Sequence, residues 1–408
     1  MTKTVENSTH KRHEANDIID FTRSVPPMPP LLAQCLEETL QGRGTRPDIG
    51  MLLRNALAGG SEHDRKMAAR WLHPRFGVDL SPERIAVTNG TQSAVLLLLE
   101  GLVGQGGLLL TECLSYGVIK DLARRSHVRI AGLAMDEEGI LPDAFEAACR
   151  RERPGALYCN PTDHNPTTAI ASEGRRLALA TIARKYGVPI IEDDPVGRLH
   201  PDAPPPVAAL APDVTWYVSG VTKCLAHGVR IAYLVAPSAV ALERVVGPAR
   251  RLSHWFPSPL MAMLVSDWIR SGAAEAITAA IRGESEARRQ IALKTFSSKP
   301  CLSQEGETSA FHRPHKTVEC FRILQGADFH CKPNGLHGWL RLPASMEANA
   351  FAQELAGAGV LVRPAQLFAV GDMPVPNAIR LSFSSPLERD AVENGVERIA
   401  SLMAQKIG

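Results

Sequence analysis

Short apolar runs alternate with segments of helical spacing between residues 84 and 235. The runs that predict strands lie at residues 84–88, 108–111, 128–134, 156–159, 188–192, 215–219 and 231–235. Most are separated by segments that predict helices, at residues 91–102, 117–125, 143–151 and 174–186. Buried strands that alternate with helices are typical of α/β proteins, so we predict a seven-stranded, mainly parallel sheet with helices on both faces.

Hydrophobic patterns before and after this region of the sequence predict further elements. A Pro-rich extended segment at residues 18–30 precedes apolar positions at helical spacing in residues 31–41, and a second helix is predicted from Ser61 to His73. Residues 238–293 are predicted to be helical almost throughout, with breaks at residues 257–259 and Gly272.

A change of composition at residues 297–307 marks the approach to a smaller domain. That domain is predicted to contain strands near residues 338–342, 360–362 and 378–383, and helices at residues 346–357 and 387–406. A chain of 408 residues is longer than most single domains. We therefore predict a flexible N-terminal arm at residues 1–16, a large domain at 17–296 and a small α+β domain at 297–408.

The composition narrows the class of protein. With 45% hydrophobic and 22% charged residues, the chain resembles an ordinary globular enzyme. Its net charge of +2 and dispersed Lys and Arg residues give no reason to expect nucleic-acid binding. The eight cysteines include no C-x-x-C pair, so we expect reduced thiols, no metal site and a cytoplasmic location. No signal peptide or membrane-spanning run is apparent.

One lysine is placed between two of the apolar strands. Lys223 follows the predicted strand at 215–219 and Gly220, and the strand at 231–235 comes soon after. A lysine held there loses hydration, so its pKa falls and its neutral amine becomes a nucleophile for carbonyl compounds. Arg230 stays charged and suits a phosphate. A reactive lysine beside a phosphate anchor is what pyridoxal phosphate chemistry requires, whereas a solvated surface lysine is the alternative.

Polar residues at other strand ends point to the same chemistry. Gly90, Thr91 and Gln92 lie where a strand ends and a helix begins, and backbone N–H groups at such a point can bind a phosphate. Residues 192–194 are three consecutive carboxylates, which repel one another unless a cation lies near them. Arg380 stands in an apolar strand and needs an anion, for which a carboxylate has the best geometry.

The segment from Tyr217 to Tyr233 resembles the lysine motif of the class I/II aminotransferases, which have fold type I, the pyridoxal-phosphate-dependent transferase fold. The resemblance implies that Lys223 forms a Schiff base with pyridoxal 5′-phosphate and that Arg230 holds the cofactor phosphate. Gly90, Thr91 and Gln92 match the family's phosphate loop and receive the same role.

Other positions follow in family order. Tyr116 falls where the family stacks an aromatic ring on the pyridine, and Asn165 lies in a turn that resembles P-x-x-Q-N-P-T-G, from which it would donate to the phenolic oxygen. Asp193 matches the aspartate that pairs with the pyridine nitrogen. Arg380 matches the arginine that binds the substrate α-carboxylate. Each residue also has a purely structural alternative. Tyr116 would be a core tyrosine, Asn165 a turn residue that caps its own backbone, Asp193 part of an acidic loop, and Arg380 a member of a structural ion pair.

The sequence departs from the family motifs at five positions. Gly220 replaces a phosphate-binding Ser or Thr, and His227 replaces a proline. In the turn around Asn165, His164 stands for Gln and Thr168 for Gly. Val196 replaces the tyrosine that donates to the phenolic oxygen of the cofactor.

The resemblance runs from about residue 60 to residue 405. It is nearest the aminotransferase half of GntR-type regulators and the aminoadipate-like transaminases, although too few residues precede the Pro-rich segment to hold a helix-turn-helix domain. It implies an enzyme of amino acid metabolism that moves an amino group between an amino acid and a 2-oxo acid, as a homodimer. The family's partner tyrosine has no counterpart in residues 52–57.

Two other functions stay open. The departures at Val196, His164 and Thr168 leave room for a lyase, decarboxylase or cyclase on the same fold. A ligand sensor that only binds the cofactor is the non-enzymatic alternative, and the intact Lys223 counts against it. No sequence feature identifies the amino donor or acceptor.

Overall fold

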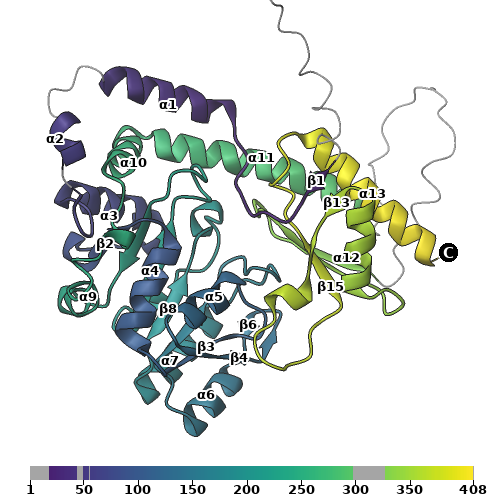
Figure 1. The fold of residues 1–408 in the computed structure, drawn as a ribbon, viewed down its shortest axis with the longest axis horizontal. Coiled ribbons are helices and arrows are strands. Elements are labelled where there is room, and N and C mark those ends of the chain that lie inside the picture. The colour runs from purple at the N-terminus through teal and green to yellow at the C-terminus, as the bar shows by residue number, and fades with distance from the viewer. Residues whose placement is uncertain (1–17, 44–48, 55, 297–326, 408) are drawn as a thin grey trace, which may run out of the picture.

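The computed structural model describes residues 18–43, 49–54, 56–296 and 327–407 (Figure 1). The arm predicted at residues 1–16 and the composition change at 297–307 lie outside these described residues. Two main sheets organise the described part, a larger one between residues 85 and 235 and a smaller one between residues 328 and 381.

Seven strands form the larger sheet, in the order β2-β10-β9-β8-β7-β3-β4. They are β2 (Ile85–Thr88), β3 (Leu108–Glu112), β4 (Arg129–Leu133), β7 (Ala156–Cys159), β8 (Ile190–Asp193), β9 (Thr215–Gly220) and β10 (Ala232–Val235). β10 runs antiparallel to β2 and β9, and the other neighbouring pairs are parallel. The predicted seven-stranded, mainly parallel sheet is confirmed.

Helices cover both faces of this sheet because successive strand side chains point to opposite faces. On β10, Tyr233 joins a buried cluster with Trp268, whereas Leu234 joins a different cluster on the other face. One face is covered by α3 (Glu62–Phe76), α6 (Pro142–Arg151), α7 (Glu173–Tyr186) and α10 (Pro259–Ser271). The other is covered by α4 (Thr91–Leu98), α5 (Val118–Arg125) and α9 (Ala239–Val246).

Local capping explains where the helix before the sheet begins and ends. The Ser61 side chain accepts a hydrogen bond from the backbone of Asp64, and the Asp64 carboxylate accepts one in return from the backbone of Ser61. This capping box starts α3 at the position predicted for it. The helix continues past the predicted end at His73 and stops at Gly77, whose φ of 70° lies in the left-handed region.

The smaller sheet has the strand order β11-β12-β15-β14. Its strands are β11 (Asp328–Cys331), β12 (Gly338–Arg341), β14 (Arg363–Pro364) and β15 (Ala378–Leu381). α12 (Ala348–Gly357) and α13 (Arg389–Ile407) share a buried cluster with this sheet, and the long α11 (Ala273–Phe296) connects α10 to it (Figure 1). The division into two domains at residue 296 stays a prediction.

The N-terminal segment, residues 18–30, lies beside the smaller sheet. Its strand β1 (Ile19–Asp20) pairs in parallel with β13 (Val360–Leu361), although the two are distant in sequence. The segment then leads into α1 (Pro30–Arg43), which packs near α10 and α11 on the other side of the molecule (Figure 1). Further elements include α2 (Ile49–Arg54), α8 (Val207–Leu210) and a hairpin of β5 (Met135–Asp136) and β6 (Gly139–Ile140).

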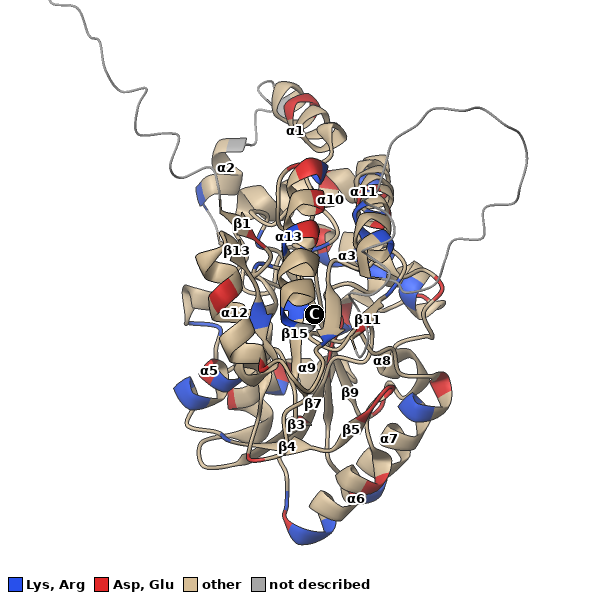
Figure 2. Ribbon diagram, turned by 90° about the vertical axis from the view of Figure 1, so that its right-hand side faces the viewer, with Lys and Arg blue, Asp and Glu red and all other residues tan. Residues whose placement is uncertain are grey.

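Lys and Arg residues alternate with Asp and Glu residues along the outer helices of the ribbon, rather than gathering by sign (Figure 2). None of the helices in the described residues is both long enough and apolar enough to cross a membrane. The same residues contain no group of three or more His, Cys, Asp or Glu side chains that could hold a metal ion.

Candidate active site

A cavity of about 580 Å³ lies where the ends of several strands of the larger sheet meet the smaller sheet and the N-terminal segment. Every predicted site residue lines it, namely Gly90, Thr91, Gln92, Tyr116, Asn165, Asp193, Lys223, Arg230 and Arg380. The structure thus brings together residues that are as far apart in the sequence as Gly90 and Arg380. Their individual roles stay predictions.

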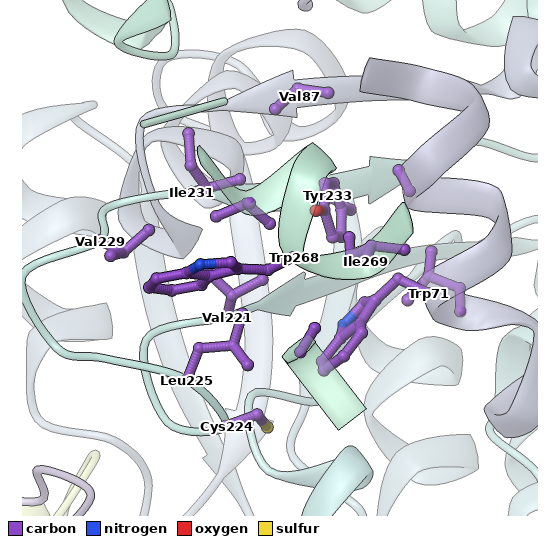
Figure 3. Close-up of a cluster of buried hydrophobic side chains, with 14 of the residues drawn as sticks. Trp71, Val87, Val221, Cys224, Leu225, Val229, Ile231, Tyr233, Trp268 and Ile269 are labelled. Atoms are coloured by element: carbon purple, nitrogen blue, oxygen red, sulfur yellow. The ribbon is translucent and has the colours of Figure 1, made fainter. Parts of the chain in front are cut away.

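The turn that carries Lys223 is anchored by its apolar neighbours. Val221, Cys224, Leu225 and Val229 are buried in one cluster with Trp268, beneath the ends of β9 and β10 (Figure 3). The side chain of Lys223 instead lines the cavity. Packing of the flanking residues therefore fixes the backbone from which the lysine extends.

Lys223 has the electrostatic surroundings expected of a reactive amine. Burial lowers the pKa of its ammonium group to about 8; the nearby positive charge of Arg380 acts in the same direction, and the carboxylate of Asp193 opposes it. Its Nζ donates a hydrogen bond to the backbone carbonyl of Ser24 in the N-terminal segment. Lys223 is half-buried, and its role as a reactive amine stays a prediction.

The three consecutive carboxylates at the end of β8 have different surroundings. The Glu192 carboxylate lies 3.3 Å from the guanidinium of Arg176, and the Asp194 carboxylate lies 3.0 Å from that of Arg75. Both arginines are buried, so each pair is a buried ion pair. These cations account for two of the three carboxylates, and neither forms an ion pair with Asp193.

Asp193 points toward the cavity instead. Its Oδ2 accepts a hydrogen bond of 2.6 Å from the hydroxyl of Tyr158, while its buried Oδ1 has no hydrogen-bond partner among the described residues. Burial raises the pKa of this carboxyl group to about 7, and the Tyr158 hydrogen bond opposes the rise. A cationic N–H group in the cavity would satisfy the free oxygen and restore the charge of the carboxylate.

The opposite end of the cavity offers donors for a phosphate. Gly90 precedes the first turn of α4 with a φ of +85° and provides no side-chain cap, so the first N–H groups of the helix are left for a ligand. A Cβ at this position would lie only 3.4 Å from Nη2 of Arg230. The glycine therefore keeps open the space between the helix start and the guanidinium.

The side chain of Thr91 explains why residue 220 is a glycine here. A Cβ added to Gly220 would lie 2.8 Å from Cγ2 of Thr91, closer than two carbon atoms can pack. The methyl group of Thr91 thus excludes the Ser or Thr side chain that the family motif places at residue 220. Glycine is required here for space, and Thr91 stands at the helix start where the family binds phosphate.

The other departures lie in different surroundings. His227, which replaces the proline of the family motif, is exposed, so its larger side chain displaces no buried group. Thr168 has a φ of 62°, in the region that favours the glycine of the family motif. His164 is buried, and its Nδ1 lies 2.8 Å from the Thr167 hydroxyl. Val196 lines the cavity, which therefore lacks the tyrosine hydroxyl of the family at that point.

Arg380, Asn165 and Tyr116 form the side of the cavity next to the smaller sheet. Nη1 of Arg380 donates to the Asn165 side-chain oxygen at 2.9 Å, while the side-chain Nδ2 of Asn165 has no hydrogen-bond partner among the described residues. Burial, together with the nearby positive charge of Arg363, lowers the pKa of Arg380 to about 9. The Tyr116 hydroxyl accepts a 3.3 Å hydrogen bond from Gln92.

Sequence reasoning missed two residues with direct contacts to the site. Tyr158 lies in the predicted strand 156–159, and the alternation of side chains along that strand was the signal that could have placed it toward Asp193. Arg363 lines the cavity from β14, a strand of two residues that no periodicity predicts.

These residues fit pyridoxal phosphate. The orphaned oxygen of Asp193 suits a protonated ring nitrogen, the uncapped start of α4 with Arg230 suits the phosphate, and Lys223 suits the aldehyde. The fold and the cavity thus define a pyridoxal-phosphate enzyme. A family model described as aminotransferase class I and II matches residues 56–399, and the chain belongs to that family. Its cofactor is pyridoxal 5′-phosphate.

Similar proteins include both regulators and enzymes. The chain is 27% identical over 339 residues to the uncharacterized HTH-type transcriptional regulator YdeF of Bacillus subtilis, covering 83% of this chain and 67% of that protein. It covers only 59% and 61% of the similar regulators YdfD and YisV from the same organism. It is also 26% identical over 342 residues to the 2-aminoadipate transaminase of Thermus thermophilus, covering 82% and 77% of the two chains.

Solved structures agree with this assignment. An archaeal alanine:glyoxylate aminotransferase matches with a TM-score of 0.79 and 25% identity, over 97% of this chain and 93% of that chain. LysN, the α-aminoadipate aminotransferase of Thermus thermophilus, complexed with N-(5′-phosphopyridoxyl)-L-leucine, matches with a TM-score of 0.76 and 23% identity, over 98% and 95%. The predicted family, fold and cofactor are confirmed.

Proposed function

We propose that the protein transfers an amino group from an amino acid to a 2-oxo acid with pyridoxal phosphate bound at Lys223. The observation that carries this proposal is one cavity that joins a lysine of lowered pKa, an unpaired carboxylate oxygen and a buried arginine. Membership of the aminotransferase class I and II family supports it.

Each residue has a distinct part in this reaction. When bound, pyridoxal phosphate supplies a ring that withdraws electrons from the substrate Cα. The Asp193 carboxylate holds a proton on the ring nitrogen, and the Tyr158 hydroxyl fixes the orientation of that carboxylate. Arg380 binds the substrate carboxylate and so directs the Cα–H bond toward Lys223. Lys223 Nζ, with a pKa of about 8, takes the proton from Cα as general base.

The phosphate end anchors the cofactor through this chain's own donors. The N–H groups of Thr91 and Gln92 at the start of α4 and the guanidinium of Arg230 bind the phosphate in this proposal. Tyr116 would pack on the ring, and Asn165, whose side-chain oxygen accepts from Arg380, would donate from its side-chain Nδ2 to the phenolic oxygen.

A test of transamination uses one substrate at a time. The cofactor-loaded protein is mixed with a panel of amino acids without any oxo acid, and release of 2-oxo acid is measured. A transaminase releases one equivalent per site and then stops until a 2-oxo acid acceptor is added. Continued release of 2-oxo acid without an acceptor would overturn the proposal in favour of a lyase, and continued release of CO2 would do so in favour of a decarboxylase; Val196 at the cavity wall favours these alternatives.

We also propose a cytoplasmic homodimer. Large apolar side chains are exposed on α1, on α2 and just after α2, at Leu40, Met51, Leu53 and Leu57. A second hollow of about 500 Å³ adjoins them, lined by residues that include Leu57 and Met263. Apolar surface of this kind supports association with a second copy of the chain. The six described cysteines are free thiols, in keeping with a reducing compartment.

A further inference from the structure

Two arginines face the cavity side by side from neighbouring strands of the smaller sheet. β14 and β15 are antiparallel, and Arg363 is the register partner of Arg380. Side chains of directly opposite residues lie on the same face of a sheet, about 5 Å apart at their Cβ atoms. Both side chains line the cavity that holds Lys223.

The two guanidinium groups converge on one oxygen atom. Nε of Arg363 donates to the backbone carbonyl of Thr22 at 2.9 Å, and Nη2 of Arg380 donates to the same carbonyl. Within the described residues, no carboxylate forms an ion pair with either arginine, and the buried Nε of Arg380 has no partner. The carboxylate of Asp20 attracts Arg380, but its Oδ1 accepts hydrogen bonds from the backbone N–H and the hydroxyl of Thr22.

The partners of these two cations are neutral: the Thr22 carbonyl for both, and the Asn165 side-chain oxygen and the Phe368 ring for Arg380. Hydrogen bonds from a guanidinium to a carboxylate are roughly twice as strong as those between neutral groups, and they are often bidentate. The point on which Arg363 and Arg380 converge is therefore better suited to a carboxylate than to the oxygen that it now holds. The N-terminal segment supplies that oxygen, and the same segment accepts the hydrogen bond from Lys223.

We infer that Arg363 is a second binding residue for the substrate α-carboxylate, which replaces the Thr22 carbonyl and is held by Arg363 and Arg380 together. This inference rests on the proposed function, because it assigns the substrate end of the same cavity. Since both arginines bind the group that all α-amino acids share, Arg363 contributes affinity to every amino acid and oxo acid alike. It does not select among side chains.

The test measures binding and needs no turnover. Butyrate, with one carboxylate, and glutarate, with two, are titrated against the cofactor-loaded protein by following the absorbance of the bound cofactor. We expect Arg363→Leu to weaken both ligands to a similar degree, by about 10- to 100-fold, which is the range for losing hydrogen bonds to a charged group. Arg341→Leu is the matched control, because Arg341 is exposed on β12 of the same sheet and does not line the cavity.

Several results would overturn the inference. Butyrate binding that is unchanged in Arg363→Leu would exclude contact with the α-carboxylate, and loss of glutarate binding alone would assign Arg363 to a side-chain carboxylate. Failure of the wild type to bind butyrate would also overturn it. If the leucine variant does not fold, Arg363→Gln and Arg363→Lys decide, with weaker binding in Gln than in Lys. A protein that binds as expected but transfers no amino group would refute the proposed function and leave this inference standing.

Discussion

Asp193 differs from its acidic neighbours Glu192 and Asp194 because no arginine in the described part of the chain forms an ion pair with it. Glu192 and Asp194 each lie against a buried arginine, while Asp193 has one oxygen bonded to Tyr158 and one left without a partner among the described residues. A buried carboxyl group of this kind is unfavourable unless a ligand supplies the missing charge. The cofactor-free protein therefore carries an electrostatic cost at the residue that the cofactor needs most.

That cost predicts a pH-dependent stability. The pKa of Asp193 is raised to about 7 in the folded protein, so between about pH 4 and pH 7 the unfolded chain loses this proton while the folded protein retains it. The contribution of Asp193 to the free energy of unfolding thus falls as the pH rises through this window. Relative to wild type, cofactor-free Asp193→Asn should gain stability from about pH 4.5 to pH 8, by at most about 4 kcal/mol for a shift of this size.

Urea denaturation of both proteins at the two pH values measures this difference. The exposed Asp202→Asn serves as the control and should show no comparable change with pH. A constant difference between Asp193→Asn and wild type at all pH values would contradict the buried, proton-retaining carboxyl group.

Lys223 gives a second prediction at this scale. Borohydride reduction of the loaded wild type should fix the cofactor covalently to Lys223, and Lys223→Ala should lose that label, as measured by mass spectrometry of the peptides. Lys120→Ala is the control, because Lys120 lines the same cavity but its Nζ donates to the carbonyls of Leu367 and Ala369. A label that persists in Lys223→Ala on another lysine would refute the assignment.

At the scale of elements, the end of β9 and the start of α4 are fitted to each other. A side chain at Gly220 would collide with the methyl group of Thr91, so these two positions should be coupled. We expect Gly220→Ser to destabilise the protein by about 1–3 kcal/mol through overpacking. In a Thr91→Ser background, which lacks the methyl group, the same change should cost clearly less.

A double-mutant cycle by chemical denaturation tests this coupling. Thr91→Ser alone supplies the fourth corner of the cycle. If Gly220→Ser destabilises the wild-type protein and the Thr91→Ser variant equally, the two elements do not constrain each other as the structure indicates.

The strands of the larger sheet could be predicted because each is a buried apolar run within a regular alternation with helices. The predicted run at residues 156–159 matches β7, and the others differ from the observed strands by one or two residues at their ends. β13 has only two residues but falls in the predicted strand at residues 360–362, whereas the equally short β1 and β14 are not predicted. Their pairing depends on partners far along the chain.

The same limit applies to the site. Local motifs located Lys223, Asp193 and Arg380, and the structure brings them into one cavity. The hydroxyl that holds Asp193 and the second arginine beside Arg380 are contacts between separate strands. Only the alternation of side chains along residues 156–159 points to the first contact, and one sequence without its fold contains no local signal for the second.

At the scale of the whole molecule, the apolar surface around α2 predicts how copies of the chain associate. Light scattering should give twice the chain mass of 44.1 kDa. Paired changes Leu53→Asp and Leu57→Asp place charges on this surface and should shift the protein toward the monomer. Leu177→Asp, at an exposed leucine on α7, is the matched control and should remain a dimer. A wild-type protein that is monomeric and fully active would refute the proposed dimer.

The loop between β9 and β10 is closed at both ends. Gly220 pairs with Ala232 in the sheet, and the backbone N–H of Val221 bonds to the carbonyl of Ile231 at 3.1 Å. The number of residues between these two fixed ends therefore determines where Lys223 lies. Val221, Leu225 and Val229 of this loop are buried, whereas Gly228 is exposed and does not line the cavity. Inserting or deleting even one residue would move the lysine away from Asp193, so we expect the loop to tolerate substitution of Gly228 and no change of length.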